Sequence, residues 1–66
     1  MFKITNRWLL EHRTKNGGYT KPQLALIGVD WPPVHGWKEK VIGTPLDNES
    51  RMTFEWLAME TKIEAM

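Results

Sequence analysis

The clearest hydrophobic pattern lies in the last third of the chain. Apolar side chains recur there at i, i+4, i+7, i+11 and i+14, at Met52, Trp56, Met59, Ile63 and Met66. This interval is typical of one face of an amphipathic helix, which Asp47 or Asn48 would cap. We expect the stripe to pack inside the protein. Because it reaches the last residue, a homodimer formed through this C-terminal helix is the alternative.

A second helical pattern comes near the start of the chain. Trp8 and Leu9 lie one turn beyond Ile4, which predicts an amphipathic helix over residues 6–15. The glycine pair at positions 17 and 18 ends it, because glycine adopts the left-handed conformation at little cost.

The next helix has specified ends. Thr20 and Gln23 have the spacing of a capping box, which predicts a two-turn helix over residues 21–27. Gly28 then stands where the helix should stop, and Val29 follows in the position of a Schellman-type cap. So short a helix must pack against its neighbours.

The Trp31-Pro32-Pro33 segment delays the third helix. Each proline disfavours the helical region for the residue before it, so the helix begins no earlier than Pro33 and runs to Val41 or Ile42. Val34, Trp37 and Val41 would share one of its faces. A strand over residues 40–43 is the weaker alternative, and residues 44–46 are expected to be a connector. The sequence thus predicts one all-α domain of three to four helices spanning residues 1–66.

Composition narrows the class. The 66 residues contain four tryptophans and no cysteine, so aromatic packing must substitute for disulfides and for a larger core. The N-terminus lacks the apolar run of a signal peptide, and no stretch approaches the roughly 20 apolar residues of a membrane span. We therefore expect a protein of the cytoplasm with no membrane partner.

Charge is divided unevenly along the chain, although the net charge is only +1. Residues 1–43 hold seven basic and three acidic side chains, whereas residues 44–66 hold two basic and five acidic ones. Such asymmetry indicates either a face for nucleic acid or two complementary halves. The candidate phosphate contacts are Arg7, Arg13, Lys15, Lys21, His35, Lys38 and Lys40. A solvated basic face is the alternative for the same residues.

The central segment resembles the helix-turn-helix of the lambda-repressor and Cro class. The matching positions are Thr20, Gln23, Leu24, Ala25, Gly28, Val29, Val34 and Trp37. The resemblance implies a helix-turn-helix-like corner and binding to double-stranded DNA. One departure is clear, because Trp31 and two prolines stand where that class carries base-reading side chains.

Residues 17–37 also resemble a segment of small phage-encoded accessory proteins. The shared pattern is Gly-Gly-Tyr/Trp-Thr-x-x-Gln-Leu followed by Gly-Val-x-Trp-Pro-Pro-x-x-Gly-Trp. This resemblance implies a phage or prophage protein acting in the cytoplasm of a bacterial host. It implies no catalytic residue.

Motifs for catalysis, cofactors or metals are missing from the sequence. Ser50 is the sole serine and has no histidine near it in sequence, and the two histidines are 23 positions apart, which matches no zinc spacing. Gly17 and Gly18 lack the remaining residues of a phosphate-binding loop. We therefore expect neither an enzyme nor a bound cofactor or metal.

Two functions remain. The first is weak DNA binding, alone or within a complex, through the basic residues named above. The second is a protein-interaction module that docks on a host protein through Trp31, Met59, Ile63 and Met66. Clusters of Trp and Met are typical of adaptable binding surfaces. The alternative for Trp31 is that it lies in a rigid corner and that its indole covers the core.

Overall fold

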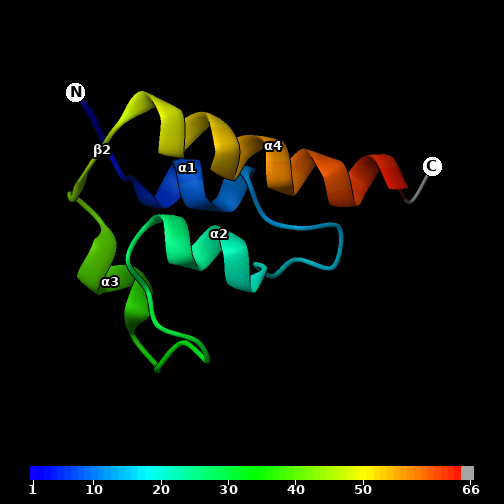
Figure 1. Cartoon of the computed structure of the whole chain (residues 1–66). Coiled ribbons are helices and arrows are strands. Elements are labelled where there is room, and N and C mark those ends of the chain that lie inside the picture. The colour runs from blue at the N-terminus through cyan, green and yellow to red at the C-terminus, as the bar shows by residue number, and fades with distance from the viewer. Residues whose placement is uncertain (65–66) are drawn as a thin grey trace.

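The computed structural model describes residues 1–64, which form four helices and one pair of short strands. In Figure 1 the longest helix crosses the top of the molecule, with α1 and α2 on one side of it and α3 furthest away. In chain order the elements are β1 (Phe2–Lys3), α1 (Asn6–Glu11), α2 (Lys21–Leu26), α3 (Trp37–Val41), β2 (Pro45–Leu46) and α4 (Asn48–Glu64).

The expected all-α class is wrong, because β1 and β2 form a two-stranded antiparallel sheet. Phe2 pairs with Leu46 and Lys3 with Pro45. The ladder is prolonged by a hydrogen bond from the Ile4 N–H to the Thr44 carbonyl, at 2.9 Å. The segment around Pro45 was expected to be a connector. Because proline cannot continue a helix, this segment stays extended and the N-terminal residues supply its partner strand.

The first helix is shorter than the predicted span of residues 6–15. It ends at Glu11, where His12 is its C-cap. The chain then folds into a tight turn in which the Thr14 N–H donates to the Gly18 carbonyl at 2.7 Å. This turn satisfies the backbone groups that a longer helix would have used.

The predicted ends of the second helix are confirmed. The Thr20 hydroxyl accepts from the Gln23 N–H, and the Gln23 amide oxygen accepts from the Thr20 N–H at 2.9 Å. At the other end Gly28 has a φ of 78°, and the Val29 N–H donates to the Leu24 carbonyl at 2.9 Å. That bond completes the Schellman-type cap.

The expected helix-turn-helix-like corner is wrong. Helix α3 begins only at Trp37, because Gly36 has a φ of 86°, outside the helical region. Residues 27–36 therefore separate α2 from α3 as a loop. A helix-turn-helix joins its helices by a turn of about three or four residues. The loop, which contains a cis peptide bond between Trp31 and Pro32, descends below α2 in Figure 1, away from α4.

The core forms where α1, α2 and α4 meet. Phe54 is its centre, fully buried, with its ring 4.5 Å from that of Trp8. Gln23 is fully buried beside it and donates from its amide to the Phe54 and His12 carbonyls. The buried apolar residues are Ile4, Trp8, Leu9, Leu24, Ile27, Val41, Leu46, Phe54 and Ala58.

Helix α4 turns the opposite face inward from the one predicted. Phe54 and Ala58 are buried against the other helices. The predicted stripe points outward instead, with Met52, Trp56, Met59 and Ile63 all exposed. The sequence predicts the stripe as core because its spacing is that of one face of an amphipathic helix. The other face turns inward because the Phe54 ring packs against Trp8 of α1 and the Phe54 carbonyl accepts from Gln23 of α2. Met66 lies outside the described residues.

Candidate interaction surfaces

Tyr19 is the anchor of a mixed aromatic and cationic surface. Its hydroxyl donates to the Leu9 carbonyl at 2.7 Å, which fixes the ring against the end of α1. The Trp37 ring meets it edge-on, with centroids 5.3 Å apart, and the Lys38 Nζ lies 5.5 Å from the Tyr19 centroid. Burial raises the pKa of the Tyr19 hydroxyl, and the positive charge of Arg13 opposes that shift. The ring therefore has the Lys38 ammonium over it and the edge of Trp37 beside it.

Further predicted phosphate contacts lie beside this ring. Lys15 lines an open depression together with Tyr19 and Thr20, and Lys21 follows directly at the start of α2. We call Arg13, Lys15, Lys21 and Lys38 the cationic cluster. Lys15 and Lys38 come from separate segments, and folding brings both next to Tyr19.

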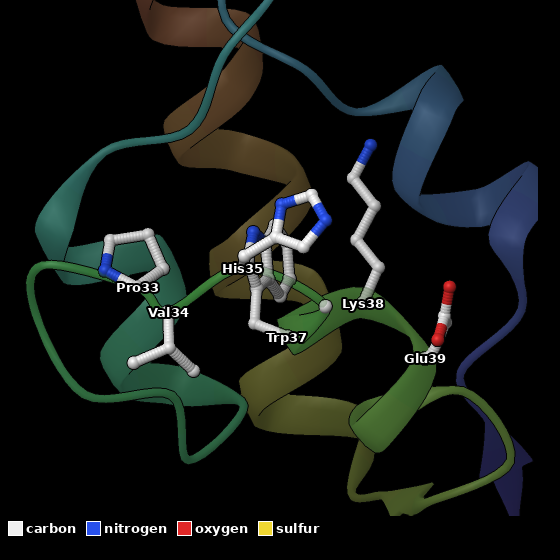
Figure 2. A pocket seen from close by; sticks show the side chains of 7 residues that line it. Pro33, Val34, His35, Trp37, Lys38 and Glu39 are labelled. Carbon is white, nitrogen blue, oxygen red and sulfur yellow. The ribbon is translucent and has the colours of Figure 1, made fainter.

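The other predicted phosphate contacts lie outside the cationic cluster. Arg7 lies 3.8 Å from Glu11 in a salt bridge on the exposed side of α1. Lys40 lines a different depression, which it shares with Asp30. His35 lines the same depression as Lys38, and Figure 2 shows both side chains extending to one side of the segment while Val34 points to the other. Of the seven phosphate contacts predicted from the sequence, the cationic cluster includes four.

A charged network ties α1 to α4 next to the core. The Glu55 carboxylate accepts from the Trp8 indole N–H at 2.7 Å and from Arg51 Nε at 3.1 Å. His12 Nε2 lies 3.9 Å from the same oxygen. Burial disfavours the charged form, but the bonds from Trp8 and Arg51 and the charge of His12 outweigh it, so the Glu55 pKa lies below its usual value. This network orients two helices. Within residues 1–64 no group of three or more His, Asp or Glu side chains is placed to hold a metal ion.

The second surface is the outward face of α4. Its apolar stripe consists of Met52, Trp56, Met59 and Ile63, with exposed fractions of 67%, 59%, 55% and 57%. Beside it, Met59 and Lys62 line a shallow depression that reaches across to Glu11 and His12 of α1. Figure 1 shows no other element over the upper side of α4. Large exposed apolar patches on small proteins mark contact sites.

The predicted partner residues do not form one surface. Met59 and Ile63 lie together on the apolar stripe, whereas Trp31 is half-exposed on the loop at the far end of the molecule. Met52 and Trp56 belong to the stripe but had been assigned to the core. Their helical spacing with Met59 was visible in the sequence. A second apolar set, Phe54 and Ala58, was the signal that either face of this helix could turn inward.

Comparison with known proteins adds no relative. No protein-family model matches the chain, and neither the curated proteins nor the solved structures that were searched contain a match. Among the described residues no helix has the length and apolar character needed to cross a membrane. The function must therefore be inferred from the two surfaces themselves.

Proposed function

We propose that this chain is a protein-interaction module whose apolar stripe on α4 binds a helix with a matching apolar face. The single observation behind the proposal is the exposure of four large apolar side chains along one helix face. Burying a side chain of this size contributes about 1.5–3 kcal/mol, so leaving all four in water forgoes a large stabilisation. A partner helix recovers it.

The recognition mode follows from the spacing. Met52, Trp56 and Met59 stand at i, i+4 and i+7, which is the pattern of anchors in helix-to-helix binding. Methionine adapts to irregular partner surfaces, and tryptophan is enriched among the residues that dominate binding energy. Helix α4 is also held by Phe54 and Ala58 on its inner side, so its conformation needs no ordering on binding.

A stripe variant and a matched control test the proposal. Ile63→Glu places a charge in the stripe, whereas Val34→Glu makes the same change at an equally exposed apolar residue on the remote loop. Each protein is immobilised and exposed to a bacterial lysate, and the proteins retained by the wild type are identified, purified and titrated. We expect a purified partner whose affinity falls at least about tenfold with Ile63→Glu and is unchanged with Val34→Glu.

The proposal fails if neither a purified protein nor a second copy of the chain binds the wild type through the stripe, or if both variants bind as the wild type does. In a phage setting, which the resemblance of residues 17–37 implies, the partner would be a host protein.

The cationic cluster supports a second candidate function, weak binding of double-stranded DNA through phosphates. The observation that favours it is the position of Lys38 over the Tyr19 ring, with Lys15 lining the depression beside the same residue. Cations at such positions hold phosphates without reading bases. Because contacts to phosphates carry no sequence information, binding through such contacts alone would be independent of sequence.

A salt titration tests this second function. With about three phosphate contacts, the logarithm of the affinity for a labelled random duplex should fall against that of salt with a slope of roughly −3. Lys15→Glu with Lys38→Glu should abolish the binding, while Arg7→Glu, outside the cluster, should weaken it little. No binding at the lowest salt would eliminate this function and leave the protein-interaction proposal untouched.

A further inference from the structure

We propose that the helix bound by the apolar stripe is α4 of a second copy of this chain, packed antiparallel across a two-fold axis. This inference rests on the proposed function, because it names the partner of the same surface. Three features support the inference. They are the spacing of the side chains in the apolar stripe, the charges beside the stripe and the exposed area of the stripe.

The stripe has the spacing of a coiled-coil seam. Its members follow one another four, three and four residues apart, which is the alternation that keeps apolar positions facing a partner helix. In an antiparallel pair, Met52 faces Ile63 of the second copy and Trp56 faces Met59 of the second copy. These layers put each methionine opposite a larger or branched side chain. The central layers bring a thioether to an indole, which is a favourable contact.

The charges beside the seam select the antiparallel arrangement. In that arrangement Glu55 lies opposite Lys62 of the second copy, and the symmetry forms the pair twice. Trp8, Arg51 and His12 all reach the Oε2 atom of Glu55, and within residues 1–64 no hydrogen bond or ion pair engages Oε1, which can accept from the incoming lysine. A parallel arrangement would instead set Glu55 against Glu60 of the second copy, which are like charges. Charge complementarity therefore favours one direction only.

The available area fits a weak dimer. At their exposed fractions the four side chains present on the order of 100 Å² each, so two copies with their flanking residues bury about 1,000 Å² in total. That is near the lower limit for a specific interface, a size typical of weak and transient association. Figure 1 shows α4 along the edge of the molecule.

Sedimentation equilibrium gives the first test. Between about 5 and 500 µM, the wild type and Val34→Glu should shift from monomer to dimer, as expected for micromolar affinity. Ile63→Glu should stay monomeric, and Lys62→Glu should raise the dissociation constant by about tenfold, because it faces Glu55 of the second copy. A monomeric wild type over this range overturns the inference. A lysate protein that binds the wild type through Ile63 would then still uphold the proposed function.

Cysteine cross-linking tests the direction of packing, since the chain has no cysteine of its own. Met52→Cys and Ile63→Cys proteins are mixed in equal amounts in a glutathione buffer, and the disulfides are identified by mass spectrometry. Antiparallel packing predicts that the mixed disulfide between positions 52 and 63 dominates. Dominant 52–52 and 63–63 disulfides indicate parallel packing and overturn the inference, as does a random distribution of all three. Circular dichroism of each variant checks that the fold is kept.

Discussion

At the scale of single residues, the side chain of Gln23 links three helices through its hydrogen bonds. Its amide oxygen accepts from the Thr20 N–H, and its amide nitrogen donates to the His12 and Phe54 carbonyls. One side chain thus serves the start of α2, the end of α1 and the middle of α4. The capping role could be predicted from the spacing of Thr20 and Gln23. The two bonds from the amide nitrogen could not, because His12 and Phe54 are remote in sequence.

Replacing Gln23 by leucine should lower the free energy of unfolding by about 2–3 kcal/mol, because buried backbone groups lose their partners. Urea denaturation measures the change. Lys21→Leu is the control, since it introduces the same side chain at an exposed position of the same helix and should change stability by less than about 0.5 kcal/mol. Equal losses in the two variants would contradict the role given to Gln23.

Glu55 should make the free energy of unfolding depend on pH. Its pKa lies below its usual value, despite burial, because of the hydrogen bonds from Trp8 and Arg51. A carboxyl whose folded pKa is depressed stabilises the fold above its unfolded pKa, near 4.5, and loses this contribution as pH falls through the folded value.

Glu55→Gln should therefore be less stable than the wild type by about 1–2 kcal/mol at pH 7. The difference should shrink as pH falls below the unfolded pKa of the carboxyl. Urea denaturation of both proteins at a series of pH values measures it. A difference that is constant down to the acid limit would show that the charge of Glu55 contributes nothing.

At the scale of elements, α4 presents two apolar faces and the fold uses one. Periodicity predicts that this segment is a helix, and it predicts the position of each apolar residue on the wheel. It does not determine which face turns inward, because that depends on the shape of α1 and α2. Phe54 fills the space against Trp8, and Ala58 on the same side of the helix is also buried. The larger Met and Trp side chains of the apolar stripe therefore remain outside.

Two truncations on α4 should differ sharply. Phe54→Ala should cost about 3–5 kcal/mol by opening a cavity in the core. Met59→Ala, on the apolar stripe, should cost less than about 0.5 kcal/mol in dilute solution, where the protein is monomeric. Thermal or urea unfolding at low concentration compares them. A larger loss for Met59→Ala than for Phe54→Ala would mean that the helix is rotated from the orientation described.

At the scale of the whole molecule, contacts between residues distant in sequence determine the features that local sequence patterns do not predict. The β1–β2 pair joins residues 2–3 to residues 45–46, which are remote in sequence, and two-residue strands carry no periodic signal. The helix-turn-helix resemblance failed for a local reason, since Gly36 delays α3 until Trp37 and leaves a loop instead of a turn. The cationic cluster also depends on folding, because Lys38 reaches Tyr19 only across that loop. The capped ends of α2 were predictable, and the packing of the elements was not.

The central claim is that the apolar stripe of α4 lies outside the fold and is available to a partner. The rate of methionine oxidation by dilute peroxide, followed by mass spectrometry of peptides, tests this most directly. Met1 is almost fully exposed and serves as the internal reference. In dilute solution Met52 and Met59 should oxidise within about threefold of the Met1 rate, because oxidation follows exposure. Strong protection of Met52 and Met59 at a concentration where the protein is monomeric would mean that the stripe is core, and would contradict the account.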